Sequence, residues 1–274
     1  MTEPVTVHIA NHVADVRLNR PEKMNALSIP MFEAITRVGK ELAQNKEIRA
    51  IVLSGEGRGF CAGLDLANMT DPDFSTDPFG AGRGGFYPNF YQLPGYVWKK
   101  MPVPVICALH GVAYGGGFQI AMGADIRIAH PGTRLSVMEI KWGLIPDMST
   151  SQTLRDLVRV DVAKELTFTG RVVEAEEALQ LGLVTSMNEN PREAALEMAA
   201  AIAKRNPNAI TYGKYLLDNT WHGDEYEGLK AEERLQAKIL KTPNQIEAVM
   251  SELQGRAANY APRDVTTFDD ITLD

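Results

Sequence analysis

The chain has 274 residues, 45% of them hydrophobic, which is enough to bury a sizeable core as one large domain or one domain with an appendage. Its formal net charge of −7 argues against a protein that binds nucleic acid or an anionic membrane surface. Two cysteines are too few for a disulfide framework, and no stretch resembles a secretion signal or a membrane span, so we expect a reduced, cytoplasmic protein.

The first part of the chain predicts two strands, a helix and a third strand. Apolar residues alternate over residues 5–9 and again over 14–18 with a turn between them, a pattern typical of a β-hairpin. Apolar residues at helical spacing follow Ser28, which we expect to be the N-cap of a helix. An apolar run at residues 50–53 predicts the next strand.

Residues 71–95 predict a long loop without regular structure. The segment carries four prolines, five glycines and six aromatic residues, and loops of this length are usually functional or disordered. Because disordered segments are poor in aromatics, we expect the loop to pack over a pocket. Residues 80–85 match G-x-G-x-x-G, but they neither follow a strand nor open an amphipathic helix, which disfavours a dinucleotide site.

The remaining chain alternates strands and helices and then becomes helical. Further strands are expected at residues 103–109 and 125–129, with a short one at 183–185. From about Pro191 the sequence predicts helices rich in Ala, Glu, Lys and Leu, and the tail after Arg263 is expected to be acidic and solvated.

Two glycine-containing turns follow apolar strands, and one of them also precedes a possible helix start. Three consecutive glycines, 115–117, separate the strand ending at Leu109 from a helix opening at Phe118. Such a cluster suits a place where the backbone must approach a ligand, and a helix N-terminus favours an oxygen that carries negative charge. Residues 59–66 form a second turn of this kind, and two turns can supply the paired N–H donors of an oxyanion hole. A tight turn with no ligand is the alternative.

Four motifs in order show that the chain resembles the enoyl-CoA hydratase/isomerase (crotonase) superfamily. They lie at residues 18–27, 60–66, 110–117 and 170–184. The resemblance implies an α/β fold, a spiral of ββα units over residues 1–200 that holds an acyl-CoA site. It also implies that residues 201–274 form a C-terminal helical region that assembles trimers, often paired as hexamers.

The same resemblance assigns the binding residues. The backbone N–H groups of Leu64 and Gly116 are the expected oxyanion donors for a thioester carbonyl. No cofactor is implied besides coenzyme A as part of the substrate, and no metal-ligand spacing is present in the sequence. The residues expected to contact the substrate or its CoA part are Lys23, Ala26, Ala62, Gly63, Leu64, Asp65, Leu66 and Gly116.

The acid/base group is where the sequence departs from the hydratase pattern. Hydratases of the family use two glutamates, of which one corresponds to Glu139 while Gln119 occupies the position of the other. Glutamine can bind a water molecule but cannot take its proton at neutral pH. An apolar setting should raise the pKa of Glu139. Asp147 matches an aspartate of the family's dienoyl-CoA isomerases, and Gly143 and Pro146 allow the chain to turn it toward the same pocket.

Each candidate has a structural alternative. Glu139 can be a paired structural carboxylate, and Asp147 can be the N-cap of a helix at residues 149–151. We expect His110 to support the site indirectly, Cys61 to be a packing residue and Trp142 to form pocket wall.

The functional hypothesis is an enoyl-CoA hydratase/isomerase that stabilises an enolate, with Glu139 as acid/base and with Gln119 and Asp147 assisting. Alternatives are a dienoyl-CoA isomerase that uses Glu139 and Asp147, an inactive acyl-CoA-binding protein, and, more remotely, a dinucleotide oxidoreductase.

Overall fold

The computed structural model describes residues 3–66 and 88–272. Within them the main sheet has six strands in the order β1-β2-β3-β4-β6-β9, and every neighbouring pair except β1 and β2 is parallel. The antiparallel β1–β2 pair is the predicted hairpin. The strands are β1 (Val5–Ala10), β2 (Val13–Leu18), β3 (Ala50–Gly55), β4 (Val105–Leu109), β6 (Ile126–Ala129) and β9 (Ser186–Met187).

A second, smaller sheet lies beside the carboxyl ends of the main strands. In it β5 (Val112–Tyr114) pairs in parallel with β7 (Arg134–Ser136), which pairs antiparallel with β8 (Val173–Glu174). Strands and helices alternate along the chain, which gives the α/β architecture that was expected from the sequence.

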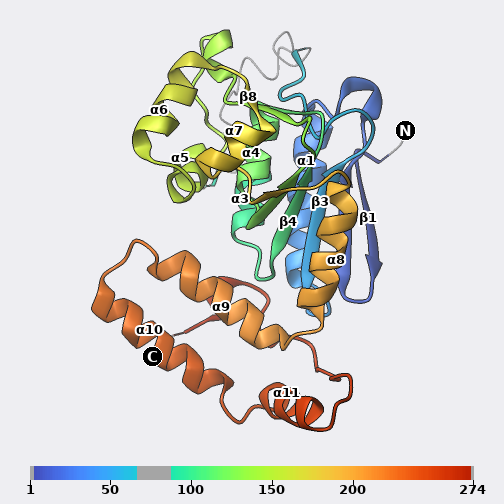
Figure 1. Ribbon diagram of the computed structural model, residues 1–274, viewed down its shortest axis with the longest axis vertical. Helices are drawn as coiled ribbons and strands as arrows, with labels where there is room; N and C mark the ends of the chain where they lie inside the picture. Colours follow the sequence, from blue (N-terminus) through green and yellow to red (C-terminus); the bar gives the residue numbers. More distant parts are fainter. Residues whose placement is uncertain (1–2, 67–87, 273–274) are drawn as a thin grey trace.

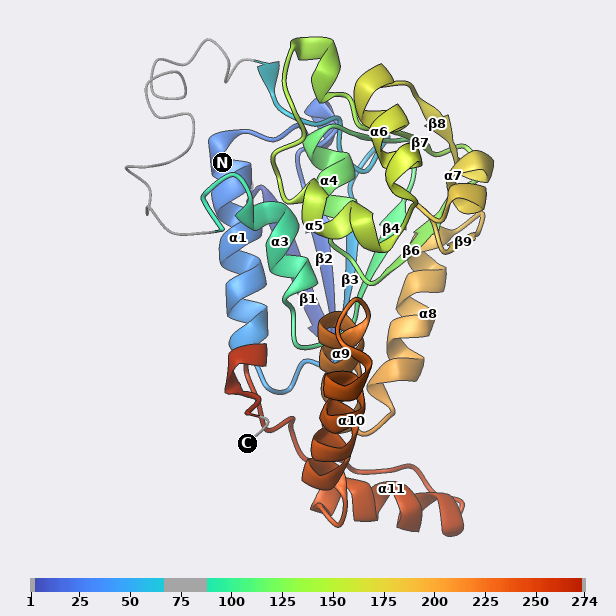
Figure 2. The same cartoon turned by 90° about the vertical axis from the view of Figure 1, so that its left-hand side faces the viewer.

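Helices cover both faces of the main sheet (Figures 1 and 2). Helices α1, α3 and α4 lie on one face, and α8 packs across β2, β3, β4 and β6 on the other. The bounds of the helices up to α8 are α1 (Ile29–Gln44), α3 (Leu93–Lys99), α4 (Gly116–Met122), α5 (Thr150–Thr153), α6 (Val160–Thr169), α7 (Ala175–Leu181) and α8 (Pro191–Ala203). Short 3-10 helices are η1 (Pro21–Lys23), η4 (Glu139–Trp142), η5 (Leu154–Asp156) and η6 (Phe268–Asp270).

Alternate residues of the central strands enter two hydrophobic clusters. In β3, Ile51 and Leu53 pack into the larger cluster with Phe32 of α1, whereas Ala50 and Val52 pack against α8. Because both faces of a covered parallel sheet are buried, its strands are continuous apolar runs, and this explains why residues 50–53 could be predicted as a strand.

The C-terminal helices extend beyond the sheet (Figure 1). Helices α9 (Pro207–Thr220), α10 (Glu225–Ile239) and α11 (Pro243–Leu253) begin at side-chain N-caps, namely Asn206, Asp224 and Thr242. An ion pair of 2.7 Å between Lys214 of α9 and Asp125 joins them to the core. The division at residue 200 stays a prediction, and α8, which spans it, packs on the main sheet.

The prediction of a solvated tail after Arg263 is wrong for residues 264–272, the part of the tail that the structure describes. Val265, Phe268 and Ile271 are buried in a small cluster with Tyr212 of α9 and Leu235 of α10. The aspartates of this segment drew attention to its charge, but the apolar residues between them decide where it lies, because burying them is favourable.

Several expected boundaries are also corrected. Residues 93–95 belong to helix α3, whose Pro94 stands in the first turn, where proline is tolerated. The strand expected at 183–185 forms at Ser186–Met187 instead. Leu183 and Val184 are apolar because they pack in the core, and they do not pair with a strand. The helix expected to open at Phe118 begins at Gly116.

Candidate active site

The two glycine turns identified in the sequence lie side by side. The segment after β3 forms a bridge with β5 in which Cys61 pairs with Ala113. The Cys61 N–H donates to Val112 O at 3.0 Å, and the Tyr114 N–H donates to Cys61 O at 3.0 Å. This pairing brings the start of α4 next to residues 61–64.

A second bridge, between Leu27 and Leu64, leaves the backbone N–H of Leu64 without a hydrogen-bond acceptor among the described residues. Leu27 pairs with Leu64, so that the Leu27 N–H donates to Gly63 O and the Asp65 N–H donates to Leu27 O, at 2.8 and 3.0 Å. In parallel pairing the intervening residue points its own N–H away from the partner strand. Within the described residues, no acceptor is found for the Leu64 N–H.

The amide of Gly116 is also free. Gly116 is the first residue of α4, where N–H groups have no partner inside the helix, and no other described residue accepts from it. A Cβ atom at Gly116 would lie 2.6 Å from Leu27 Cδ1, so this glycine packs against the residue that bridges to Leu64. Gly115, just before it, has φ of 50°, a conformation that favours glycine.

Leu64 and Gly116, the residues that carry these amides, both line a cavity of about 690 Å³. That volume falls within the range of roughly 300–1,000 Å³ usual for small-molecule sites. Every residue that the sequence singled out as catalytic, oxyanion-forming or substrate-binding lines this cavity. The lining consists of Lys23, Ala26, Phe32, Ala62, Gly63, Leu64, Asp65, Leu66, Tyr91, Gly115, Gly116, Gln119, Met138, Glu139, Trp142, Leu144, Asp147 and Met148.

Glu139 places a buried carboxyl group in the cavity wall. It begins η4 and is 8% exposed. Gln119 Nε2 donates to its Oε1 at 2.5 Å, whereas its Oε2 is buried and has no partner among the described residues. Burial raises the pKa of Glu139, hydrogen bonds from its own backbone and from Gln119 oppose that rise, and the charge of Asp147 adds to it. The alternative of a structural ion pair fails for the part of the chain described, because no cation there pairs with Glu139.

Gln119 is held on both sides of its amide. Its Oε1 accepts from the Met148 N–H at 2.7 Å and from the Thr150 hydroxyl. The side chain is almost completely buried in α4. Gln119 therefore connects Glu139 to the segment that enters α5.

Asp147 lies in the lining of the same cavity while remaining exposed to solvent. Gly143, with φ of 71°, ends η4 and lets the chain turn back, as the sequence suggested. The protein around the Asp147 carboxyl partly removes water from it and raises its pKa. The N-cap alternative is wrong, because Ser149 is the residue at the N-cap of α5.

Two further charged residues, Asp65 and Lys23, belong to the cavity lining. Asp65 forms an ion pair of 2.6 Å with Arg20, which occupies its carboxylate. Lys23 is an exposed cation in the lining. Asp65 is thus a structural anchor of the turn after β3, and Lys23 is available to an anionic ligand.

Three further residues named in the sequence analysis are His110, Cys61 and Trp142, and none of them was expected to be the acid or base. His110 Nε2 contacts Gly57 O at 3.0 Å and does not line the cavity. The Cys61 thiol is buried, donates to Asn25 O at 3.1 Å, and has its pKa raised to about 12 by burial. A thiol with such a pKa is a poor nucleophile at neutral pH. Trp142 lines the cavity, as expected.

The sequence reasoning missed the apolar wall of the cavity. Phe32 of α1 and Tyr91 pack edge to face with ring centroids 5.4 Å apart, and Phe90 stacks on Phe32. Only the aromatic content of residues 71–95 hinted at this wall. Residues 67–87, including the G-x-G-x-x-G match and four of the six aromatics, lie outside the described residues.

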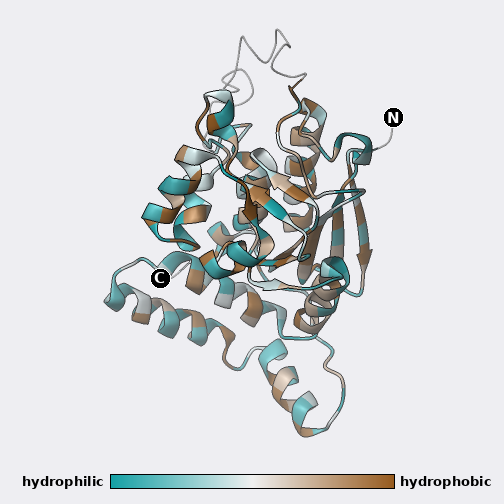
Figure 3. Cartoon of the chain, turned by 45° about the horizontal axis from the view of Figure 1, so that its top comes forward, coloured by the Kyte–Doolittle hydropathy of each residue, from teal (hydrophilic) through white to brown (hydrophobic). Residues whose placement is uncertain are grey.

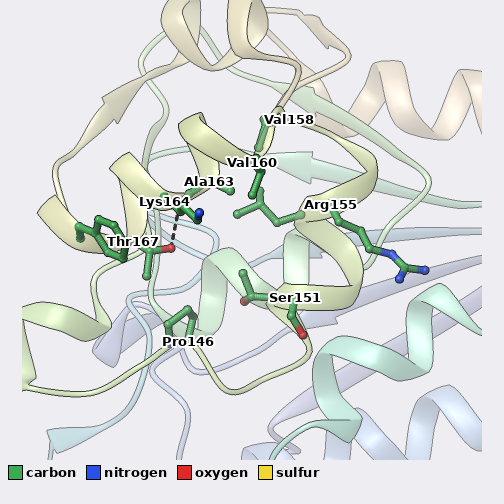
Figure 4. Close-up of a pocket in the computed structure, with 11 residues that line it drawn as sticks. Pro146, Ser151, Arg155, Val158, Val160, Ala163, Lys164 and Thr167 are labelled. Atoms are coloured by element: carbon green, nitrogen blue, oxygen red, sulfur yellow. Dashed lines mark hydrogen bonds between the residues drawn. The ribbon is translucent and has the colours of Figure 1, made fainter. Parts of the chain in front are cut away.

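Figure 4 shows the lining of a second cavity of about 370 Å³. Its labelled residues come from the loop at Pro146, from α5, η5 and α6, and from the turn at Val158, and Arg155 points away from the others. None of the described residues that line it is a carboxylate. Thr150 lines this cavity while its hydroxyl donates to Gln119, so the two cavities share a wall.

Metal-ligand clusters and membrane-spanning helices are both absent from residues 3–66 and 88–272. There, no group of three or more His, Cys, Asp or Glu side chains is arranged to hold a metal ion. No helix in the same ranges has the length and apolar character needed to cross a membrane.

Comparisons with known proteins agree on one family. Residues 8–260 match the family model described as enoyl-CoA hydratase/isomerase. The short-chain-enoyl-CoA hydratase of Clostridium acetobutylicum is 32% identical, with 89% of this chain and 92% of that protein aligned. A mouse mitochondrial Delta(3,5)-Delta(2,4)-dienoyl-CoA isomerase is 30% identical, with 89% and 77% aligned. The crystal structure of an enoyl-CoA hydratase from Bacillus anthracis, 28% identical, superposes with a TM-score of 0.85 over 94% of this chain and 98% of that one.

Proposed function

The chain belongs to the enoyl-CoA hydratase/isomerase family, and on that premise we propose that it is an enzyme that moves a double bond in unsaturated acyl-CoA thioesters. One observation carries the proposal. A buried carboxyl group with one unpartnered oxygen lines the same cavity as two unpartnered backbone amides. An acid/base group beside an oxyanion site is the arrangement that proton abstraction next to a carbonyl needs.

The two amides would stabilise the charge that develops on the substrate. When a proton leaves the carbon next to a thioester, negative charge moves to the carbonyl oxygen. The N–H groups of Leu64 and Gly116 would bind that oxygen, and they are fixed by backbone pairing before the reaction begins. Loss of one comparable donor raises a reaction barrier by about 3–4 kcal/mol in other enzymes.

Glu139 would carry the proton from one carbon to another. Its carboxylate takes the proton from C2 of a 3-enoyl thioester, which gives a dienolate held at the oxyanion site. The resulting carboxylic acid returns the proton to C4, so that the double bond moves to C2 and the glutamate is regenerated. A raised pKa suits a group that must act as base and then as acid near neutral pH.

Gln119 favours isomerisation over hydration. Hydration requires a group that takes a proton from water, and the oxygen of the Gln119 amide is already bound to Met148 and Thr150. A neutral amide cannot serve as that base. One carboxylate is enough to transfer a proton between two carbons of the same substrate.

The CoA part of the substrate is proposed to lie along the turn after β3. By resemblance, Lys23, Ala26 and residues 62–66 contact it, and all of them line the cavity. The exposed ammonium group of Lys23 suits the negative charge of a CoA phosphate.

A substrate panel tests the proposal. We expect conversion of 3-enoyl-CoA to the conjugated 2-enoyl-CoA, followed by absorbance, with hydration of 2-enoyl-CoA at least about 100-fold lower in kcat/KM, because a missing general base costs about that much. With substrate deuterated at C2, part of the label should reappear at C4. Equal rates of hydration would overturn the isomerase assignment, and tight CoA-thioester binding without any turnover would favour an inactive binding protein.

Asp147 supports a second candidate, the isomerisation of a dienoyl-CoA. Its carboxyl lies in the same cavity and acts electrostatically on Glu139, and the mouse relative named above is a dienoyl-CoA isomerase. This reaction would use Glu139 and Asp147 at two separate carbons. Asp147→Asn would then abolish turnover of a 3,5-dienoyl-CoA while sparing that of a 3-enoyl-CoA, and equal effects on both would count against this role.

We also propose that the C-terminal helices assemble a homotrimer or hexamer. Large apolar side chains remain exposed on α9, α10 and α11, and Figure 3 shows hydrophobic segments along these helices. Exposed apolar surface of this extent commonly marks an interface. The residues are Leu217, Trp221, Tyr226, Leu229, Leu240, Ile246, Val249, Met250 and Leu253.

Light scattering on a size-exclusion column is expected to give the mass of three or six chains. Trp221→Glu, which places a charge on this surface, should shift the mass toward the monomer. Glu197→Gln on the exposed side of α8 should leave it unchanged. A monomeric wild-type chain at micromolar concentration would contradict the proposal.

A further inference from the structure

Resting on the proposed function, we propose that Gln119 is a positioning residue: held by Met148 and Thr150, it fixes the Glu139 carboxyl group through Oε1. The inference starts from three hydrogen bonds that converge on one buried amide. It concerns a position at which the sequence only indicated the loss of a second carboxylate.

The orientation of the amide follows from its partners. The Met148 backbone N–H can only donate, so the group of Gln119 that faces it must be the amide oxygen. The amide nitrogen therefore faces Glu139. In the reverse orientation the Gln119 nitrogen would face the Met148 N–H, so that two donors would meet. The Gln119 oxygen would then face the Glu139 carboxylate, so that two acceptors would meet.

This orientation distinguishes the two oxygens of Glu139. The Gln119 Nε2–H bond to Oε1 can persist when Oε1 is a carboxylate oxygen or the carbonyl oxygen of the protonated acid. A proton on Oε1 would compete with that donor. The proton of the protonated acid therefore belongs on Oε2, the oxygen that is buried without a partner, while Gln119 fixes the carboxyl group in one orientation through Oε1.

The charged surroundings of Glu139 are few. Asp147, on the segment after η4, is the charged group that acts on it through space. Lys23 and Asp65 line the cavity from the turn after β3, and Asp65 is paired with Arg20. Beside the backbone of Glu139 itself, Gln119 is the neutral side-chain donor that offsets the burial of the carboxylate, and its removal should make Glu139 harder to ionise.

The main variant is Gln119→Met, which keeps the length of the side chain and removes both amide groups. We expect kcat for 3-enoyl-CoA isomerisation to fall about 10- to 100-fold, as is typical when a hydrogen bond to a charged group is lost, with KM changed less. The acidic limb of the kcat–pH profile should move to higher pH, because ionised Glu139 is the base and it would ionise later.

Two other variants, Gln119→Glu and Thr150→Val, test the same inference if Gln119→Met folds poorly. Gln119→Glu retains acceptors for Met148 and Thr150 but puts a like charge beside Glu139, and it should move the acidic limb further up. Thr150→Val removes one bond to the Gln119 oxygen and should act in the same direction more weakly. Thr153→Val is the matched control, because this buried hydroxyl on α5 contacts only backbone carbonyls at 3.5 Å, and the profile should not move.

A titration without substrate separates this inference from the proposed function. The carboxyl band of Glu139, identified by its loss in Glu139→Gln, can be followed by infrared spectroscopy against pH in the wild type and in Gln119→Met. A higher midpoint in the variant supports the inference even if no enoyl-CoA is turned over. An unchanged midpoint, or an unchanged kcat–pH profile in an active enzyme, overturns it.

Discussion

Replacement of Glu139 by glutamine is expected to lower kcat for double-bond isomerisation by about 10²- to 10⁴-fold, the usual contribution of a general acid/base. The introduced amide has nearly the same size and can still accept the hydrogen bond from Gln119. It cannot exchange a proton with carbon, so the chemical step loses its only buried carboxyl group in the described lining of the cavity. Affinity for the acyl-CoA should change little, because the oxyanion amides remain.

The stability of the Glu139→Gln variant should match or exceed that of the wild type. Glu139 buries a carboxyl oxygen without a partner, which costs free energy in the folded state. The measurements are kcat, the Kd for a substrate or product thioester, and Tm. Glu197→Gln, an exposed substitution of the same kind on α8, is the control. Activity of Glu139→Gln near that of the wild type would refute the assigned role.

Replacement of Gly117 by alanine is expected to impair both activity and folding. A Cβ atom at this position would lie 2.6 Å from both Cβ and the backbone oxygen of Cys61. Cys61 is fixed by its bridge to Ala113, so the start of α4 must move instead. Displacement of the Gly116 amide by about 1 Å can cost about 100-fold in kcat, and overpacking of this kind costs about 1–3 kcal/mol of stability.

Gly213→Ala provides the matched control for that substitution. Gly213 lies within α9 and its added Cβ would meet no atom within 4 Å. Alanine is favoured over glycine inside a helix by roughly 0.5–1 kcal/mol, so the Tm of this variant should rise slightly while kcat stays unchanged. If Gly117→Ala behaved like Gly213→Ala in both Tm and kcat, the turn at the start of α4 would not be the precise element that the proposal requires.

Local sequence was informative where one physical requirement dominates a residue choice. The strand at residues 50–53 is apolar throughout because both of its faces are covered, and the triple glycine can lie only where backbone is closely approached. Gly143 likewise indicated a turn after Glu139, and its φ of 71° ends η4. These features could be predicted because each depends on the conformation or burial of the residue itself.

Other expectations failed because local patterns were ambiguous. The acidic residues after Arg263 suggested a solvated tail, although Phe268 and Ile271 bury that segment against α9 and α10. The N-cap interpretation of Asp147 was equally compatible with its neighbours, yet Ser149 takes the position. For the C-terminal segment, contacts with helices distant in sequence decided the outcome.

The sequence by itself indicated the two glycine turns and the apolar core strands along the chain, because glycine content and apolar periodicity are local properties, whereas the expected roles of Leu64, Gly116 and Glu139 came from the resemblance to a known family. Only the tertiary structure decided that Gln119 is locked between Met148, Thr150 and Glu139, and that Phe32 and Tyr91 form the cavity wall. Those relations join segments that are distant along the chain, and hydrogen-bond direction and burial exist only after these segments have packed together.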